Sequence, residues 1–575
     1  MQRRNKMSKI KLTINNMEVE GKPGDMIIDV ARRNGIEIPH FCWNDRMERI
    51  GACRLCIVEV KGMQKLIASC CTPIKEGIVV NTHSPRVLEA RRTNMELLLA
   101  NHDLNCVTCK ENLSCKLQKY AEELMIQDIR FDGEKRTENP DDSSVSIRRD
   151  NNKCILCEQC VRVCNDIQTV YAIGLQKRGF HTKVSPPFGL DMNKSACVNC
   201  GQCVVACPTG ALTEKSDIQG VINALNSDKY LIAQTAPSIR ATLGECFGMP
   251  VGTPVTGKMV TALKEAGFHQ VFDTDLAADI CIIEEATEFI KRFKEKKDLP
   301  MITTCCPAWI KFGEQFFFDE LHHMSSCRSP QAILASLIKT YYAEKIKKNP
   351  KDIILVDIMP CTAKKFEILR PEFSGEADYV LTTVELAKLL KQLNVDFSSL
   401  KDSKFDNPLG ESTGAAAIFG HTGGVMEAAL RTAADWISGK DLKKIDYKAI
   451  RSMDTMKEAE IEIGGEKVKV CVVHTLGEAR KLMEQIKEGK SPYHFIEIMA
   501  CYGGCIGGGG QPPPHNKKTL AKRTKALIDV DEKMDVRKSH KNPSAIKIYK
   551  EYLGEFGSKR AHKLLHTHYS KKDYI

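Results

Sequence analysis

Two cysteine runs decide how the first half of the chain folds: Cys154-Ile-Leu-Cys157-Glu-Gln-Cys160-Val-Arg-Val-Cys164 and Cys197-Val-Asn-Cys200-Gly-Gln-Cys203-Val-Val-Ala-Cys207-Pro208. Each has the C-x2-C-x2-C-x3-C spacing that binds a 4Fe-4S cluster, and in a tandem pair the fourth cysteine of each run ligates the other cluster. We therefore predict a two-cluster domain over residues 147–216. One cluster is held by Cys154, Cys157, Cys160 and Cys207, and the other by Cys164, Cys197, Cys200 and Cys203.

Upstream, a short predicted hairpin and helix lead into four more cysteines. Residues 9–20 alternate around a turn at Asn15-Asn16, and a helix is predicted over 26–34. This ββα order opens a small β-grasp fold. Four thiolates would supply the two protein ligands that each iron of a 2Fe-2S cluster needs. We predict such a domain over residues 1–85, with the ligands Cys42, Cys53, Cys56 and Cys70.

A third ligand set follows a predicted helical stretch over 84–100. It reads His102-x3-Cys106-x2-Cys109-x5-Cys115. Three cysteines at ligand spacing need a fourth partner, and an imidazole is an acceptable ligand for iron. We predict a 4Fe-4S cluster with His102, Cys106, Cys109 and Cys115 as ligands, in a domain over 86–130, and a polar linker over 132–146.

From about residue 217 apolar strands alternate with helical segments, which predicts a large α/β domain with parallel sheets over 217–515. Three predicted strands, at 299–304, 352–360 and 494–500, run directly into cysteines. Ligand crevices in α/β proteins lie outside the carboxyl ends of strands, so we expect these thiols to converge on one metal site. They are Cys305, Cys306, Cys361 and Cys501, with Cys505 four residues on.

Composition narrows the class of protein. The chain has 575 residues, 42% hydrophobic and 27% charged, with 25 cysteines. It shows no apolar run long enough for a signal peptide or a membrane span, so we expect a cytoplasmic protein whose cysteines bind metal rather than form disulfides. Residues 516–575 carry 16 Lys/Arg against 7 Asp/Glu and thus account for +9 of the formal +11 charge. Cluster thiolates would cancel much of this charge, so we expect no nucleic-acid partner. Five cysteines lack a cluster partner and are expected to be buried structural thiols: Cys71, Cys246, Cys281, Cys327 and Cys471.

The three cysteine loops of the α/β domain resemble the signature loops of the iron-only, or FeFe, hydrogenases. They read Thr303-Thr-Cys-Cys-Pro-Ala-Trp309, Met359-Pro-Cys-Thr-Ala-Lys364 and Glu497-Ile-Met-Ala-Cys-Tyr-Gly-Gly-Cys-Ile-Gly-Gly-Gly-Gly-Gln-Pro512. The resemblance covers almost the whole chain, including the order of the accessory cluster domains and a C-terminal segment over 562–569. Four loop positions depart from the commonest family wording, none of them an expected ligand: Thr304, Ala308, Tyr502 and Gly507.

The resemblance implies an H-cluster, a 4Fe-4S cube joined to a two-iron subcluster with CO, CN and a dithiolate bridge. Its cube ligands would be Cys306, Cys361, Cys501 and Cys505, the last bridging to the two-iron unit. Cys305 would deliver protons, because a thiol with an unperturbed pKa of about 8.5 can give and take a proton near neutrality. The relay behind it to solvent would consist of Glu285, Ser325, Glu288 and Arg292. Lys364 would bind a cyanide ligand, and the other implied pocket residues are Ala236, Pro237, Ser238, Gln331, Met359 and Met499.

The predicted fold is thus multidomain α+β and α/β: a β-grasp ferredoxin domain, a small His/Cys3 cluster domain, a two-cluster bacterial ferredoxin domain, a large α/β catalytic domain, and a basic tail over 516–575 that packs on it. The resemblance implies a monomeric enzyme that reversibly reduces protons to H2 with electrons from ferredoxin or a similar carrier. It also implies maturation proteins that load the two-iron unit. Two alternatives stay open: a hydrogenase subunit of an electron-bifurcating or NADH-linked complex, and a non-catalytic hydrogenase-like iron-sulfur protein.

Overall fold

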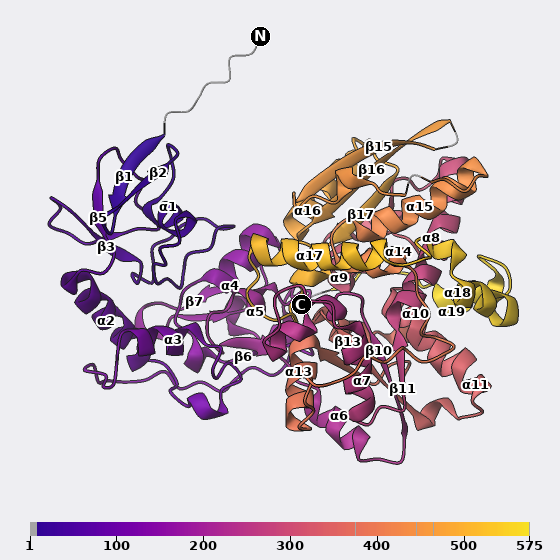
Figure 1. Ribbon diagram of the computed structural model, residues 1–575, viewed down its shortest axis with the longest axis horizontal. Coiled ribbons are helices and arrows are strands. Elements are labelled where there is room, and N and C mark those ends of the chain that lie inside the picture. The colour runs from indigo at the N-terminus through magenta and orange to yellow at the C-terminus, as the bar shows by residue number, and fades with distance from the viewer. Residues whose placement is uncertain (1–8, 374, 444, 464, 574–575) are drawn as a thin grey trace, which may run out of the picture.

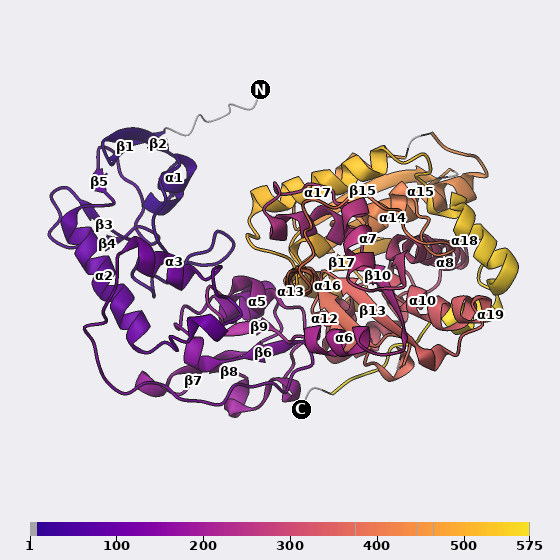
Figure 2. The ribbon, with the colours of Figure 1, turned by 60° about the horizontal axis from the view of Figure 1, so that its bottom comes forward.

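In the computed structural model, which describes residues 9–373, 375–443, 445–463 and 465–573, the N-terminal domains lie to one side of a large C-terminal lobe (Figures 1 and 2). The division falls near residue 217, where the sequence predicted a change to alternating strands and helices. The first 216 residues hold short strands and helices between cysteine loops. The large lobe holds two four-stranded sheets surrounded by helices.

The N-terminal sheet has five strands in the order β2-β1-β5-β3-β4. Its first two strands form the predicted antiparallel hairpin, and Asn15 and Asn16 both adopt positive φ in the turn, as asparagine tolerates. The predicted helix over 26–34 is observed as α1. The elements of this domain are β1 (Ile10–Ile14), β2 (Met17–Gly21), α1 (Ile27–Arg33), β3 (Ile57–Val60), β4 (Ile67–Ala68) and β5 (Val79–Asn81).

The next segments are short because cysteine loops interrupt them. The predicted helix over 84–100 begins at Pro85, with the Ser84 hydroxyl accepting from the Val87 amide. The predicted linker over 132–146 is not free of the module that follows, since Asp141 pairs with Arg149 by backbone and side chain. The elements are α2 (Pro85–Ala100), α3 (Lys116–Glu123), β6 (Ile147–Arg149), α4 (Gln159–Arg162), β7 (Gly174–Gln176), β8 (Lys183–Ser185), α5 (Gln202–Ala206) and β9 (Leu212–Glu214).

The large lobe is built on two sheets. The first, β11-β10-β13-β14, is parallel throughout, and the second, β12-β17-β16-β15, is parallel except for its edge strand β15. This confirms the prediction of largely parallel sheets, whose central strands are buried on both faces. The strands are β10 (Tyr230–Thr235), β11 (Gln270–Asp273), β12 (Met301–Ile302), β13 (Ile353–Met359), β14 (Tyr379–Thr382), β15 (Met456–Ile463), β16 (Glu466–His474) and β17 (Phe495–Met499).

Helices flank both sheets, and α8 is the longest of those in the described residues. The strand predicted over 299–304 is observed only as β12, because Pro300 has no amide hydrogen and the chain turns at Cys306 into a helix that begins with Pro307. The helices are α6 (Ile218–Leu225), α7 (Thr256–Glu265), α8 (Thr274–Glu295), α9 (Pro307–Phe316), α10 (Pro330–Leu337), α11 (Ala343–Lys345), α12 (Ala363–Glu367), α13 (Thr383–Gln392), α14 (Gly414–Ala417), α15 (Gly424–Ser438), α16 (Leu476–Lys487), α17 (Lys517–Glu532), α18 (Pro543–Ile548) and α19 (Lys559–Leu565).

The C-terminal segment contacts the lobe through buried ion pairs rather than as a free basic tail. Arg523 pairs with Glu245 and donates to the backbone of the glycine loop at Ile506. Asp531 is paired with buried Arg431, and His566 with buried Glu284. Arg523, Arg537 and Lys538 of the segment are each paired with an acidic residue of the lobe.

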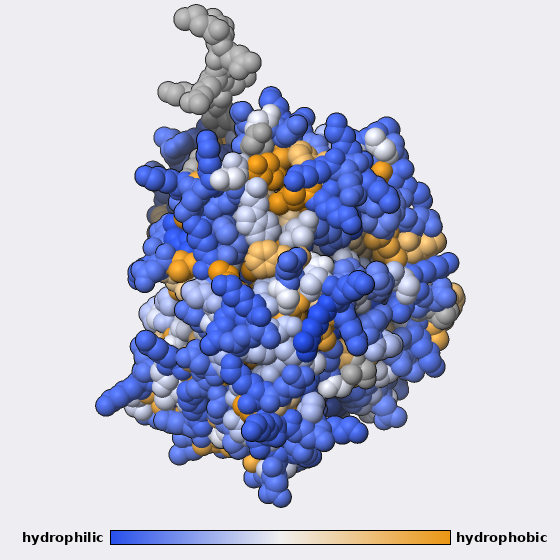
Figure 3. Space-filling view, turned by 90° about the vertical axis from the view of Figure 1, so that its right-hand side faces the viewer, coloured by the Kyte–Doolittle hydropathy of each residue, from blue (hydrophilic) through white to orange (hydrophobic). Residues whose placement is uncertain are grey.

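The outer face of the lobe is mainly hydrophilic, with apolar side chains in small separate patches (Figure 3). Among the described residues, no helix combines the length and the apolar character needed to cross a membrane.

Candidate active site and iron-sulfur sites

The three predicted cysteine loops meet at one cavity between the two sheets. Cys361 follows β13 of the first sheet, whereas Cys305 and Cys306 follow β12 and Cys501 follows β17 of the second. The cavity holds about 730 Å³ of space between atoms. Every pocket residue implied by the resemblance lines it: Ala236, Pro237, Ser238, Cys305, Cys306, Gln331, Met359, Cys361, Lys364, Met499, Cys501 and Cys505.

The loop that carries Cys501 and Cys505 is pressed against neighbouring backbone, and only glycine fits. A Cβ at Gly504, where φ is +88°, would lie 2.6 Å from the Thr422 amide nitrogen, and one at Gly508 would lie 2.3 Å from the Pro360 carbonyl oxygen. The loop can thus present two thiols to the cavity while its backbone packs tightly behind them. Burial raises the pKa of the Cys501 thiol well above its usual range, so a thiolate here needs a positive metal for compensation.

Cys305 borders the same cavity from the end of β12. Burial raises the pKa of its thiol well above the usual range, and the nearby Glu285 carboxylate adds to the rise. The protein alone therefore holds Cys305 as a protonated thiol. The sequence predicted a group that titrates near neutrality, and in the protein alone burial keeps the thiol protonated there.

Behind Cys305, α8 and the segment after β12 bring the four predicted relay residues together. The Ser325 hydroxyl donates to Glu288 Oε2 over 2.9 Å, and the Arg292 guanidinium donates to Glu288 Oε1 over 2.6 Å. Glu285 lies one turn before Glu288 on the same helix. The row thus runs from the buried Glu285 to an ion pair whose two side chains are 17% and 15% exposed.

Glu285 is an unusual carboxyl group. It is fully buried, and neither oxygen makes a hydrogen bond of normal geometry to the described residues, although the Thr304 amide and the Ser325 hydroxyl lie close by. Burial, and then the negative charge of Glu288, raises the pKa of Glu285 to about 8. A carboxyl group that titrates near neutrality can both accept and release protons at working pH.

Lys364 reaches the cavity from α12 with a carboxylate behind it. Its ammonium donates to Glu367 Oε2 over 2.6 Å, to Ser329 Oγ over 2.9 Å and to the Cys305 carbonyl over 3.4 Å. Burial opposes the charge of Lys364, but the attraction of Glu367 outweighs it and raises the pKa, so the cation is kept. Sequence reasoning missed Glu367 and Ser329, although the i,i+3 spacing of Lys364 and Glu367 was a usable signal.

The remaining implied pocket residues line the same cavity. Gln511 Nε2 donates to Ser238 Oγ over 3.2 Å and so fixes the Ala236-Pro237-Ser238 turn against the glycine loop. Met359 and Met499 end β13 and β17, and both are almost fully buried. Gln331 is buried, and its side-chain carbonyl has no hydrogen-bond partner among the described residues.

The two-cluster module contains two further cavities that separate the eight cysteines as the tandem spacing predicts. The first cavity is lined by Cys154, Cys157, Cys160 and Cys207, and the second by Cys164, Cys197, Cys200 and Cys203. The second cavity adjoins the active site, since the Cys501 Sγ lies 4.0 Å from the Cys200 carbonyl oxygen. Gln202 also donates to the Gly507 carbonyl over 3.0 Å, which ties the module to the glycine loop.

The two outer ligand sets both lie against the first of these cavities. The Sγ of Cys42 is within hydrogen-bonding reach of Cys53 and Cys70, and that of Cys56 is within reach of Cys70. Arg162 of α4 joins this set to the module, donating to the Cys42 carbonyl over 2.6 Å and to the Cys157 carbonyl over 3.4 Å.

In the second outer set, the Cys115 Sγ lies 4.0 Å from the Pro208 carbonyl oxygen. His102, of the same predicted ligand set, is buried, and its Nδ1 lacks a partner among the described residues. Burial lowers the pKa of His102 to about 4, so the ring is neutral and available to a metal.

Of the five cysteines expected to be buried structural thiols, Cys281, Cys327 and Cys471 are buried, and Cys246 is partly buried. Cys71 is exposed, so that expectation is wrong for it. It directly follows Cys70, and the two Sγ atoms lie 3.5 Å apart, with the Cys71 side chain at the protein surface.

Five family models of known proteins match successive parts of the chain. The family described as "Iron only hydrogenase large subunit, C-terminal domain" matches residues 229–509, and "Iron hydrogenase small subunit" matches 517–572. A 2Fe-2S iron-sulfur cluster binding domain matches 7–85, the NADH-ubiquinone oxidoreductase-G iron-sulfur binding region matches 91–130, and a 4Fe-4S dicluster domain matches 153–211.

Individual relatives cover nearly the whole chain. The NADP-reducing hydrogenase subunit HndD of Solidesulfovibrio fructosivorans is 45% identical over 99% of this chain and 100% of its own length. Iron hydrogenase 1 of Clostridium pasteurianum is 39% identical over 97% of this chain and 100% of its own. A solved structure of a variant of the [FeFe]-hydrogenase HydA1 from Chlamydomonas reinhardtii matches with a TM-score of 0.56 at 37% identity, covering 62% of this chain and 99% of that one.

Proposed function

Because this chain belongs to the iron-only (FeFe) hydrogenase family, we propose that it catalyses the reversible reduction of protons to H2 with electrons from ferredoxin or a similar low-potential carrier. The supporting observation is the cavity itself. The cavity is lined by four thiols from three loops, by the protonated thiol of Cys305 and by the cationic Lys364. A row of titratable groups leads away from it.

The residues present fit the family's H-cluster. Cys306, Cys361, Cys501 and Cys505 would hold the cube, and the two-iron unit would occupy the rest of the cavity beside it. When bound, this cofactor supplies the electrons and the metal centre at which protons and H2 interconvert. The apolar lining of the cavity excludes water and strengthens the electrostatic effect of each charged group in it.

The chain's own residues would transfer the proton between solvent and the cavity. Cys305 holds it on Sγ at the cavity, and Glu285, with its raised pKa, would exchange it with the thiol. Ser325 can accept on one side of its hydroxyl and donate to Glu288 on the other, and Arg292 holds Glu288 in place. Lys364, kept cationic by Glu367, would stabilise negative charge on a cyanide ligand.

Electrons would reach the cavity through the N-terminal domains. We assign these to residues 1–85, 86–130 and 147–216, with one 2Fe-2S and three 4Fe-4S clusters on the ligand sets described above. The catalytic domain would be 217–515, with 516–575 packed against it. The contacts of Arg162 and Cys115 bring both outer sites to the Cys154 cluster, and the contact between Cys501 and Cys200 supports an exit from its neighbour to the active site.

A second candidate is the hydrogenase subunit of an NAD(P)-linked complex. It is favoured by the full-length similarity to HndD, whose name describes an NADP-reducing hydrogenase subunit. In that case the N-terminal clusters would receive electrons from a partner flavoprotein rather than from ferredoxin.

Infrared spectroscopy and H2 assays of the matured full chain test both readings. We expect CO and CN bands, about 20 iron atoms per chain, and H2 evolution with reduced ferredoxin. Absence of the CO and CN bands after maturation would overturn the hydrogenase proposal. Turnover with a reduced artificial donor but not with ferredoxin would favour the subunit reading, which purification with an NAD(P)-binding partner would then confirm.

A further inference from the structure

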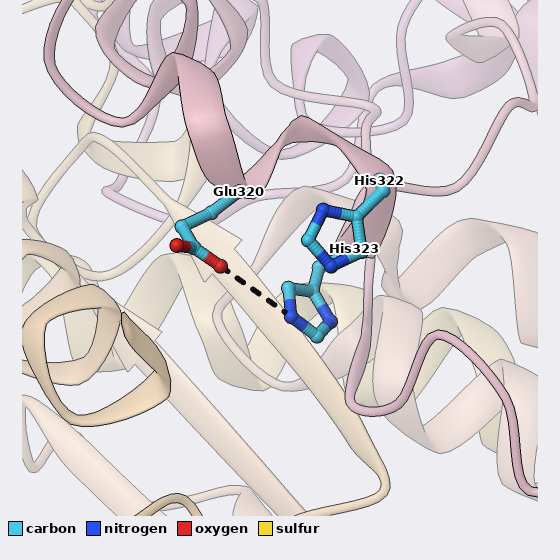
Figure 4. A group of neighbouring side chains, drawn as sticks. All are labelled: Glu320, His322 and His323. Carbon is cyan, nitrogen blue, oxygen red and sulfur yellow. Dashed lines mark ion pairs between the residues drawn. The ribbon is translucent and has the colours of Figure 1, made fainter. Parts of the chain in front are cut away.

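Three potential metal ligands lie together outside the catalytic cavity, in the short 3-10 helix Phe318–His323 that follows α9. They are Glu320, His322 and His323, and their ligand atoms all lie within 4.8 Å of one another. Glu320 Oε2 is 3.6 Å from His323 Nε2, and Figure 4 shows the carboxylate pointing at that ring with the His322 ring beside it. His323 is buried and His322 exposed, so the group has one side toward the protein and one toward solvent.

Each imidazole is held in the form that binds a metal. His323 Nδ1 lies 3.0 Å from the Pro300 carbonyl oxygen, and His322 Nδ1 lies 3.2 Å from the Asp319 carbonyl oxygen. A carbonyl can only accept, so the ring proton of each neutral histidine sits on Nδ1 and the lone pair sits on Nε2. Metal-binding histidines in proteins are oriented in this way, by donation from the other ring nitrogen to a backbone carbonyl or carboxylate.

The group also adjoins the outer end of the row of titratable groups. The Arg292 guanidinium donates to the carbonyl oxygens of His322 over 3.1 Å, His323 over 3.3 Å and Met324 over 2.9 Å. The same guanidinium holds Glu288. The backbone of two candidate ligands is therefore part of what fixes Arg292.

We propose that Glu320, His322 and His323 bind one divalent cation of the zinc type, leaving an open fourth position toward solvent. Two imidazole nitrogens and one carboxylate oxygen are a donor set that Zn²⁺ accepts with three protein ligands. In a tetrahedral site the ligand atoms are about 3.3 Å apart, because Zn–N and Zn–O bonds are about 2.0–2.1 Å long. Glu320 and His323 are already near that separation, and the His322 ligand atom lies within 4.8 Å of both.

A bound cation would also affect proton exchange, an effect that rests on the proposed function. It would fix the backbone of His322 and His323 and with it the guanidinium that these carbonyls hold. Arg292 and Glu288 would then have less freedom to open to water. We therefore expect bound zinc to slow H2 turnover without disturbing the cofactor.

Zinc titration of the matured full-length enzyme tests the site directly. We expect calorimetry to show one binding event that is weakened in His322→Gln and in Glu320→Gln by at least the roughly 10–100-fold that loss of an outer-shell partner costs. His181→Gln, which alters an exposed histidine of the two-cluster module, is the matched control and should bind like wild type. If wild type shows no event beyond that of the His322→Gln variant, the proposal is wrong.

The effect on turnover is measured in the same titration, with iron content and the CO and CN infrared bands followed throughout. Zinc should lower H2 turnover in wild type and His181→Gln but not in His322→Gln, while the bands stay unchanged. Zinc binding without inhibition would leave the metal site standing and overturn its link to proton exchange. Absence of turnover before any zinc is added would instead count against the proposed function, and the binding measurement would still decide the site.

Discussion

The accessory cluster sites and the catalytic cavity use the same ligand, the cysteine thiolate, in different ways. In the two-cluster module, all eight candidate ligands come from two short runs, and each of the two cavities is lined by four of them. In the catalytic cavity, the ligands come from the ends of strands in two different sheets, and titratable groups on α8, α12 and the segment after β12 surround them. This difference fits the proposed roles, because electron transfer needs a buried metal whereas proton reduction also needs a supply of protons.

Two buried ionisable groups near the catalytic cavity, Lys364 and Glu285, differ in whether they have a partner. Among the catalytic groups, Lys364 is neutralised by Glu367, whereas Glu285 is left without a well-formed partner. A buried carboxyl group in that position costs stability when it is ionised, which is why its pKa rises. This loss of stability is expected if Glu285 releases and accepts protons rather than holding a fixed charge.

Replacement of a cube ligand should have the largest effect. Cys306→Ala removes one of the four proposed cube ligands, the one supplied by the loop after β12, so we expect loss of the cube and of the two-iron unit with it. Iron analysis should fall by about 6 of about 20 atoms, and the CO and CN bands should vanish. Retention of those bands would show that Cys306 is not a ligand and would weaken the contrast between the two regions.

The adjacent residue should behave differently. Cys305→Ala removes a proton-bearing thiol and no metal bond, so iron content and the infrared bands should survive. H2 turnover should fall by about 10²–10⁴-fold, the usual range for a lost general acid or base. Cys305→Ser should be almost as slow because a hydroxyl is a much weaker acid, and Cys305→Asp should retain more activity. Near-normal turnover of the alanine variant would contradict the relay.

Glu285→Gln should lower turnover less, by about 10²-fold, and should also change the pH dependence of stability. The folded-state pKa of about 8 lies above the unfolded value near 4.3, so the wild-type group stabilises the fold fully below pH 4 and this contribution is lost as pH rises toward 8. Glutamine is neutral throughout. The apparent unfolding temperature of the holoenzyme should therefore fall less between pH 5.5 and 8 in the variant than in wild type, and parallel curves would refute the raised pKa.

For the proposed electron-transfer clusters, His102→Ala should remove one accessory cluster, which is about 4 of about 20 iron atoms. Because this site lies beside the Cys154 cluster and away from the catalytic cavity, turnover with a small artificial donor should be retained, whereas turnover with ferredoxin should fall severalfold. Unchanged iron content would mean that another group ligates the fourth position. Equal loss with both donors would mean that the domain supports the fold rather than the transfer of electrons.

The accessory sites could be predicted from the sequence because their ligands are close in the chain. The runs at 154–164 and 197–207 predicted two ligand sets, and the structure places the eight thiols in two cavities with that grouping. The catalytic ligands required the strand-end argument together with the family resemblance, since Cys306, Cys361 and Cys501 are far apart in sequence. Glu367 and Ser329 were missed because they act on Lys364 rather than on the cavity. The exposure of Cys71 and the elevated pKa of Cys305 depend on local packing, which spacing does not report.

The smallest effect is expected where the sequence looks most charged. Residues 516–575 carry a net charge of +9, but Arg523, Arg537 and Lys538 are each engaged with acidic partners. Lys571 lies over the Phe318 ring with its ammonium 4.3 Å from the ring centre, on the large lobe rather than beside the outer clusters. Reversal of Lys571 and Lys572 to Glu should therefore leave the KM for ferredoxin unchanged at low and at physiological salt.

The matched variant reverses Lys61 and Lys65, exposed on the 2Fe-2S domain, where an acidic carrier would approach the outer clusters. It should raise the KM severalfold at low salt, and less so at higher ionic strength, because exposed charges are screened over about 8 Å at 0.15 M. A larger effect from the tail pair than from the domain pair would move the docking surface to the catalytic lobe and would contradict the route through the N-terminal clusters.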